Sequence, residues 1–225
     1  MRTKVRLVSF QTKYRLEVIM ANIFDLFKQI EKEKAPIVPI THIVAGLGNP
    51  GKEYDRTRHN AGFMALDEYC HANGISVTKS KFNSLVGEGN IGSARVLFMK
   101  PMQYMNRSGE SVRDAAEFYK IPPEKILIIC DDVNLDVGKL RIRRKGSDGG
   151  QKGLRDVIYQ LNSDNFPRLR VGVGKLPSGG NMINWVLGRI PKDLEEDFNT
   201  AIKNATDALP LIIMEKIDEA MCKYN

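Results

Sequence analysis

Residues 126–132 read ILIICDD, a run of five apolar residues that ends in two aspartates. A continuous apolar run of this length is typical of a strand that is buried on both faces at the centre of a parallel sheet. Other strand patterns occur at 42–46, 85–91, 95–99, 138–143 and 169–173, and helical patterns occur near 61–73, 108–120, 150–161 and 192–222. This alternation predicts an α/β fold: a single three-layer domain with a twisted, mixed and largely parallel sheet flanked by helices.

Length and composition set broad limits on the protein. A chain of 225 residues with 42% hydrophobic content suits one sizeable domain with a substantial core. No apolar run approaches the ~20 residues that a membrane-spanning helix needs. The three cysteines (Cys70, Cys130 and Cys222) lack metal-ligand spacing, and we interpret them as small buried hydrophobes. We therefore expect a cytoplasmic protein without structural disulfides, a bound metal or a membrane partner.

The amino-terminal region carries a large share of the net charge of +7. Residues 1–19 contain five basic side chains and one acidic side chain, so residues 20–225 carry a net charge of only +3. Because residues 1–19 lack the apolar core of a secretory signal, we interpret them as an upstream extension or a misassigned start. Residues 20–40 read as an amphipathic helix, with apolar residues at helical spacing over 23–30, and a proline-containing linker. Residues 41–225 then form the main domain.

A glycine-rich segment follows the first predicted strand, and residues 46–60 read GLGNPGKEYDRTRHN. Its three glycines satisfy the pattern of dinucleotide-binding folds, in which the third glycine lies in the first turn of a helix. Here Pro50 disfavours helical dihedral angles at Asn49, so a helix is not expected before about residue 60. The acidic residue that the pattern requires roughly 20 positions later falls within a helical stretch. We therefore rank a dinucleotide-dependent enzyme third, behind two other functions that later motifs indicate.

Three predicted strands deliver polar residues to one edge of the sheet, beyond the carboxyl ends where sites form in α/β proteins. The strand at 42–46 leads to Asn49 and His59, the strand at 95–99 leads toward Asn106, and the apolar run ends at Asp131. We expect Asp131 to hold His59 in one tautomer and to stabilise its charged form, so that the imidazole acts as a base. Taken singly, His59 also suits a cap or a packing position, and Asp131 also suits a turn.

The expected nucleophile is water. The chain has no Gly-x-Ser-x-Gly motif that would place an activated serine at the end of a strand. If the site hydrolyses a substrate, Asn49 and Asn106 are suited to donate hydrogen bonds to a carbonyl group or a developing oxyanion. Each of these two asparagines alone is also explained as an ordinary turn or cap residue.

Basic residues form the second signal. Residues 139–143 read KLRIR, so the cations lie on one face of a strand and the apolar residues on the other. Residues 139–175 contain ten Lys or Arg against three Asp, and the glycines at 146, 149, 150 and 153 lie between the two arginine-bearing strands. Backbone amides of such a loop approach phosphates closely, and Arg suits bidentate phosphate binding. The pattern favours contact with phosphate or nucleic acid, although a solvated charged face is the common alternative.

Taken together, the chain resembles bacterial-type peptidyl-tRNA hydrolase over residues 43–190. The matching stretches are Gly46 to Gly62; Lys100-Pro101 with Tyr104-Met105-Asn106 and Ser108-Gly109; Asp131-Asp132 with Leu135 and Gly138; Gly149-Gly150 with Gly153-Leu154; and 166–174, FPRLRVGVG. Each motif is weak alone, and the combination in this order is specific.

The resemblance implies hydrolysis of the ester that joins a peptide to tRNA, which recycles tRNA from aborted translation. It assigns water activation to His59 assisted by Asp131, and substrate positioning to Asn49 and Asn106. Cleft or tRNA contacts fall to Tyr54, Tyr104, Met105, Arg143 and Arg170, the two arginines forming a clamp on a terminal tRNA phosphate. We add Lys152 to these contacts because of its charge. A mobile lid corresponds to residues 174–188, including Trp185. The expected partner is peptidyl-tRNA, bound by a monomer without cofactor or obligate protein partner.

The chain departs from the family pattern at one place. Gln151-Lys152 stands where the family usually has His-Asn, and the missing asparagine normally helps to hold the catalytic water or the oxyanion. Lys152 could donate a charged hydrogen bond instead, or add affinity for phosphate. The alternative function is therefore an RNA-binding module with weakened catalysis, as in plant organellar relatives that assist intron splicing. Because His59, Asp131, Asn49 and Asn106 are all present, we expect an active enzyme.

Overall fold

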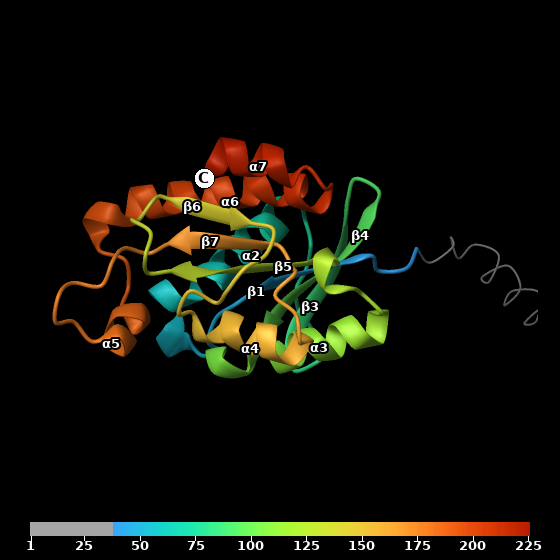
Figure 1. The fold of residues 1–225 in the computed structure, drawn as a ribbon, viewed down its shortest axis with the longest axis horizontal. Helices are drawn as coiled ribbons and strands as arrows, with labels where there is room; N and C mark the ends of the chain where they lie inside the picture. The colour runs from blue at the N-terminus through green and yellow to red at the C-terminus, as the bar shows by residue number, and fades with distance from the viewer. Residues whose placement is uncertain (1–37) are drawn as a thin grey trace, which may run out of the picture. The chain divides into compact units, whose positions relative to one another are not determined.

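The computed structural model describes residues 38–225, and Pro39–Asn225 form one compact unit. Within these residues a seven-stranded sheet has the order β2-β3-β4-β1-β5-β7-β6 (Figure 1). The strands β4, β1, β5 and β7 at its centre run parallel, and antiparallel pairing adds β3 and β2 at one edge and β6 at the other. The predicted α/β fold with a mixed sheet flanked by helices is confirmed.

Most of the predicted elements occur close to their expected positions. The strands are β1 (His42–Gly46), β2 (Lys79–Lys81), β3 (Ser84–Ile91), β4 (Ala94–Pro101), β5 (Ile126–Asp132), β6 (Leu140–Arg143) and β7 (Arg168–Gly172). The α-helices are α2 (Ala61–Ala72), α3 (Ser108–Tyr119), α4 (Lys152–Leu161), α5 (Met182–Leu187), α6 (Glu195–Ile213) and α7 (Ile217–Tyr224). The short 3-10 helices η2 (Arg58–Asn60) and η3 (Met105–Arg107) carry residues of the candidate site.

Helices cover both faces of the sheet (Figure 1). The side chains buried between the helices and the sheet form two separate apolar cores. Alternate residues of β5 belong to different cores: Leu127 and Ile129 pack on the side of α2 and α6, whereas Ile126 and Ile128 pack on the side of α3 and α4. All seven residues of β5 are buried. The continuous apolar run of this strand is therefore explained by burial on both faces.

Three sequence-based predictions about elements need correction. The strand β2 and the helix α5 were not predicted, and the helical pattern over 192–222 is divided by a break at 214–216, where Glu215 has a φ of +64°. A non-glycine residue with this backbone conformation ends the regular helix. The expected extension over 1–19 and the expected helix over 23–30 lie outside the described residues.

Two glycines set the distance between α2 and the sheet. A Cβ on Gly46, at the end of β1, would meet the carbonyl group of Gly62. A Cβ on Gly62 would lie 2.6 Å from the backbone nitrogen of Leu47 and closer still to the carbonyl oxygen of Ile129. The amino-terminal end of α2 therefore rests directly on the carboxyl ends of β1 and β5. This contact places the preceding η2 beside the end of β5.

Gly62→Ala should destabilise the protein by about 3 kcal/mol, because the new methyl group meets backbone on both sides and neither side can withdraw without opening the sheet. The free energy of unfolding from chemical denaturation measures this loss. Gly74→Ala is the matched control, since Gly74 has a φ of +64° but nothing within 4 Å of an added Cβ. Its cost should be only about 1 kcal/mol of backbone strain. Equal losses in the two variants would contradict the role of Gly62.

Candidate active site

The structure brings His59 of η2 against Asp131 of β5. The imidazole Nδ1 lies 3.0 Å from Oδ1 and 2.9 Å from Oδ2 of Asp131, and the exposed fractions of the two side chains are 12% and 2%. A carboxylate only accepts hydrogen bonds, so Nδ1 is the donor in this contact. The buried carboxylate therefore fixes the orientation of the imidazole, and in the neutral ring it fixes the tautomer as well.

Asn49 is held from three sides after the end of β1. Its Oδ1 accepts a hydrogen bond of 2.8 Å from the backbone nitrogen of Met105, and its backbone exchanges two hydrogen bonds, of 2.8 and 3.0 Å, with the side chain of Asn60. These contacts direct the remaining Nδ2 group of Asn49 as a donor at the site. Sequence reasoning did not single out Asn60, whose only signal was its position next to His59.

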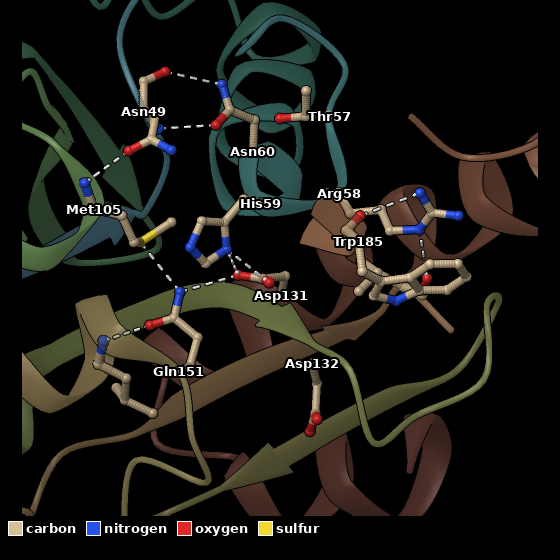
Figure 2. Close-up of polar contacts among 12 residues, drawn as sticks. Asn49, Thr57, Arg58, His59, Asn60, Met105, Asp131, Asp132, Gln151 and Trp185 are labelled. Carbon is tan, nitrogen blue, oxygen red and sulfur yellow. Dashed lines mark hydrogen bonds and ion pairs between the residues drawn. The ribbon is translucent and has the colours of Figure 1, made fainter. Parts of the chain in front are cut away.

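Gln151, the residue before α4, contacts the other side of Asp131. Its Nε2 donates to Oδ1 of Asp131 at 3.0 Å and contacts Sδ of Met105 at 3.1 Å. Its Oε1 accepts a hydrogen bond of 2.6 Å from the backbone nitrogen of Leu154 and so caps the helix. Figure 2 shows that these contacts form a closed ring. Starting at Asn60, polar contacts lead to Asn49, Met105, Gln151, Asp131 and His59 in turn, and the peptide bond between His59 and Asn60 completes the ring.

A cavity of about 690 Å³ opens at this ring. Eight of the ten predicted site residues line it: Asn49, His59, Tyr104, Met105, Asn106, Asp131, Lys152 and Arg170. Tyr54 and Arg143 are not among its lining residues, although the ring of Tyr54 packs edge-on against Tyr104 with centroids 6.4 Å apart. No serine, threonine or cysteine of the described chain lines the cavity.

The register of β6 and β7 decides which arginines face each other. Arg141 lies directly opposite Arg170, whereas Arg143 lies opposite Arg168. Opposite residues in an antiparallel pair project from the same face at close range, so Arg141 is the nearer partner for a two-arginine clamp. The part that was predicted for Arg143 stays a prediction.

Arg170 lies between a carboxylate and the glycine loop. Its Nε is 3.0 Å from Oδ2 of Asp132, but the N–H group is not aligned for a hydrogen bond, so the contact is mainly Coulombic. Its guanidinium nitrogens lie against Gly149, where a Cβ would be 2.5 Å from Nη1. Gly149 also has a φ of +56°. A residue with a side chain at position 149 would push the guanidinium out of the cavity wall.

A second arginine, Arg168, is buried and fixes the loop before α4. Its guanidinium donates to the carbonyl oxygens of Gly146, of Ser147 at 3.3 Å and of Asp164 at 2.8 Å. Burial lowers the pKa of Arg168, and no carboxylate contacts its guanidinium among the described residues. The positive charge at this position therefore serves to organise backbone carbonyl groups.

The helix α5 forms an apolar wall of the cavity that the sequence did not reveal. Met182, Ile183 and Leu187 line the cavity and are partly exposed. The segment is fastened by buried Arg58, which donates to the carbonyl oxygens of Val173, Trp185 and Arg189 and stacks 3.9 Å from the ring centroid of Trp185. Burial lowers the pKa of Arg58. The predicted mobility of residues 174–188 stays a prediction.

The cysteines and the acidic residues show no further reactive centre. Burial raises the pKa of the Cys70 and Cys130 thiols to about 12, as expected for buried hydrophobes, but Cys222 is exposed and that part of the interpretation is wrong. Within residues 38–225 no group of three or more His, Cys, Asp or Glu side chains is arranged to hold a metal ion. No helix in the same range has the length and apolar character to span a membrane.

The site combines a histidine–carboxylate pair with amide groups at the carboxyl edge of a mixed α/β sheet, and its cavity has no serine, threonine or cysteine among the described residues. The family model described as peptidyl-tRNA hydrolase matches residues 43–225. The chain belongs to the peptidyl-tRNA hydrolase family.

Individual relatives agree with this assignment. Over 184 residues the chain is 48% identical to peptidyl-tRNA hydrolase from Thermoanaerobacter sp. (strain X514), which covers 82% of this chain and 99% of the relative. It is 46% identical over 184 residues to the protein of the same name from Alkaliphilus oremlandii, with the same coverage. The crystal structure of peptidyl-tRNA hydrolase from Acinetobacter baumannii is similar with a TM-score of 0.76 at 38% identity, covering 80% of this chain and 92% of that chain.

The folded protein should react with a thiol reagent at Cys222 alone. A thiol with a pKa of about 12 supplies almost no thiolate at pH 8, and only the thiolate reacts. Titration with a chromogenic disulfide should therefore give one fast thiol in buffer and three in denaturant. Cys222→Ser should remove the fast thiol, whereas fast labelling that survives in this variant would contradict the burial of the other two.

Proposed function

We propose that this protein hydrolyses the ester bond between a peptide, or an N-blocked amino acid, and tRNA. The observation that supports the proposal most strongly is the contact between His59 and Asp131 in the wall of a cavity, in a chain of the peptidyl-tRNA hydrolase family. The products are free tRNA and free peptide, so the reaction recycles tRNA from aborted translation. The substrate is met in the cytoplasm.

Water is the nucleophile in the proposed reaction. Nε2 of His59 takes a proton from water as the oxygen attacks the ester carbonyl, and Asp131 stabilises the imidazolium that forms. Nδ2 of Asn49, with Asn106 at the same cavity, donates to the oxygen that becomes negative. When the tetrahedral intermediate collapses, the imidazolium returns the proton to the departing ribose oxygen, which regenerates the neutral base.

The basic edge of the cavity supplies the tRNA contacts. Arg170 and Lys152 line the cavity, and Arg141 projects from β6 on the face that carries Arg170. We assign to Arg141 and Arg170 the clamp on a tRNA phosphate, because their positions across the ladder suit two guanidinium groups on one anion. Tyr104, which is 60% exposed, offers an aromatic face near the reacting ester.

His59→Ala should reduce release of the blocked amino acid from N-blocked aminoacyl-tRNA by about 10²–10⁴-fold, the usual contribution of a general base. Asp131→Asn should also lose activity, since a neutral amide does not stabilise the imidazolium. Single-turnover release measures the chemical step, and retained tRNA binding in both variants is the control for folding. If wild-type protein binds tRNA without cleaving it, the protein is an RNA-binding module and the proposal is wrong.

Arg170→Ala and Arg141→Ala should each raise KM for the tRNA substrate with little change in kcat, because a phosphate that takes no part in the reaction is bound equally in the ground state and the transition state. Each should also lower the salt dependence of binding by about one phosphate contact. Arg143→Ala is the matched control on the same strand and should change KM less. A larger effect at Arg143 than at Arg141 would restore the original assignment of the clamp.

A further inference from the structure

The side chain of Gln151 is buried and uses almost all of its hydrogen-bonding capacity. It is 6% exposed, and its three polar contacts are to Asp131, Met105 and the backbone nitrogen of Leu154. A primary amide offers two donors and one acceptor oxygen, so the three contacts match its chemistry. Nothing in the reaction proposed above requires a glutamine at this place.

The partners fix the orientation of the amide. The backbone nitrogen of Leu154 is a donor, so the group facing it at 2.6 Å is Oε1. The group facing Oδ1 of Asp131 at 3.0 Å is then Nε2, and a carboxylate accepts in that contact. If the amide were rotated by half a turn, its NH₂ group would face the Leu154 N–H group, and its oxygen would face the Asp131 carboxylate. The amide is therefore locked with its donor side on Asp131.

The backbone of Gln151 is fixed as firmly as its side chain. Its nitrogen donates to the carbonyl oxygen of Asp148 at 3.1 Å, and the carboxylate of Asp148 accepts from Gly150 at 2.7 Å and from Arg155 at 3.1 Å. Hydrogen bonding from Arg155 lowers the pKa of Asp148, which keeps this carboxylate ionised. These hydrogen bonds connect the loop that carries Gln151 to α4 and hold the amide in contact with Asp131.

We propose that Gln151 is a positioning residue, which holds the Asp131 carboxylate in the orientation that His59 requires. This inference rests on the proposed function, because it describes how the same base is oriented. His59 contacts both carboxylate oxygens, whereas the donor of Gln151 contacts Oδ1 only. Without that donor the buried carboxylate loses a hydrogen bond and is free to turn about its side-chain torsion. The imidazole would then spend less time with Nε2 directed at the ester.

Two simpler roles, a helix cap and a filler of space, are separated from positioning by the choice of variants. Gln151→Glu keeps the size and the acceptor oxygen for Leu154 but replaces the donor with oxygen. Gln151→Met keeps the size and removes both polar functions. Gln151→His restores a donor and an acceptor on opposite sides of one side chain. Asp132, Lys152 and Arg170, the other charged groups that line the cavity, are unchanged in all three.

Single-turnover and steady-state kinetics on N-blocked aminoacyl-tRNA at pH 8.5 test the proposal. We expect Gln151→Glu and Gln151→Met to lower kcat on the order of tenfold, with KM changed less than about twofold, since a donor to a buried charge is lost. Gln151→His should recover most of the lost kcat. Gln160→Glu and Gln160→Met, at the other end of α4, are the matched controls and should retain wild-type kcat.

Wild-type kcat in Gln151→Met would overturn the proposal, because the size of the side chain alone would then suffice. A second readout does not depend on the reaction: the Nδ1–H proton of His59, hydrogen-bonded to Asp131, should give a low-field NMR resonance that His59→Gln removes. We expect this resonance to shift or broaden in Gln151→Met. An unchanged resonance in that variant would also overturn the proposal, whereas an inactive wild type with a shifted resonance would overturn only the proposed function.

Discussion

The contact between Gly46 and Gly62 is the constraint on which the site depends. Because neither residue has a Cβ, the amino-terminal end of α2 sits directly on the ends of β1 and β5, and the backbone nitrogen of Leu47 donates to the carbonyl oxygen of Ile129 at 2.9 Å. The two residues before α2 that matter most, His59 and Asn60, are then carried to the end of β5 and to the turn after β1. A side chain at either glycine would lift the helix, and the distance from His59 to Asp131 would grow with it.

Because side chains alternate between the two faces of β5, the neighbouring carboxylates of Asp131 and Asp132 have different partners. Successive residues of a strand point to opposite faces, so Asp131 faces His59 and Gln151 (Figure 2). Asp132 lies on the face that carries Arg170. Both carboxylates are buried. A buried carboxylate is tolerated only when donors or a cation compensate the lost hydration. Asp131 is compensated by hydrogen bonds from His59 and Gln151, and Asp132 by hydrogen bonds from Asn134 together with the nearby guanidinium group of Arg170.

The sequence was informative wherever a local pattern determined the structure. The apolar run of β5 predicted burial on both faces, and the order of strands and polar residues favoured a meeting of His59, Asn49 and Asp131 at one edge of the sheet. The sequence was less informative where the outcome depends on pairing or on distant contacts. Arg141 and Arg143 share one face of β6, so only the register with β7 distinguishes them. The helix α5 has six residues and is held by Arg58, which lies more than 100 residues away in the chain.

The position of Gln151 in the ring was also not predictable from the sequence, because it follows from packing rather than from a motif. The ring combines neutral amides with a single imidazole–carboxylate pair, and the cations lie at its margin. A guanidinium close to the base would disfavour the imidazolium that forms as water is deprotonated. Asp132, 3.0 Å from Nε of Arg170, offsets that charge. In the proposed reaction, this arrangement lets the basic surface bind tRNA while His59 still accepts a proton within the same cavity.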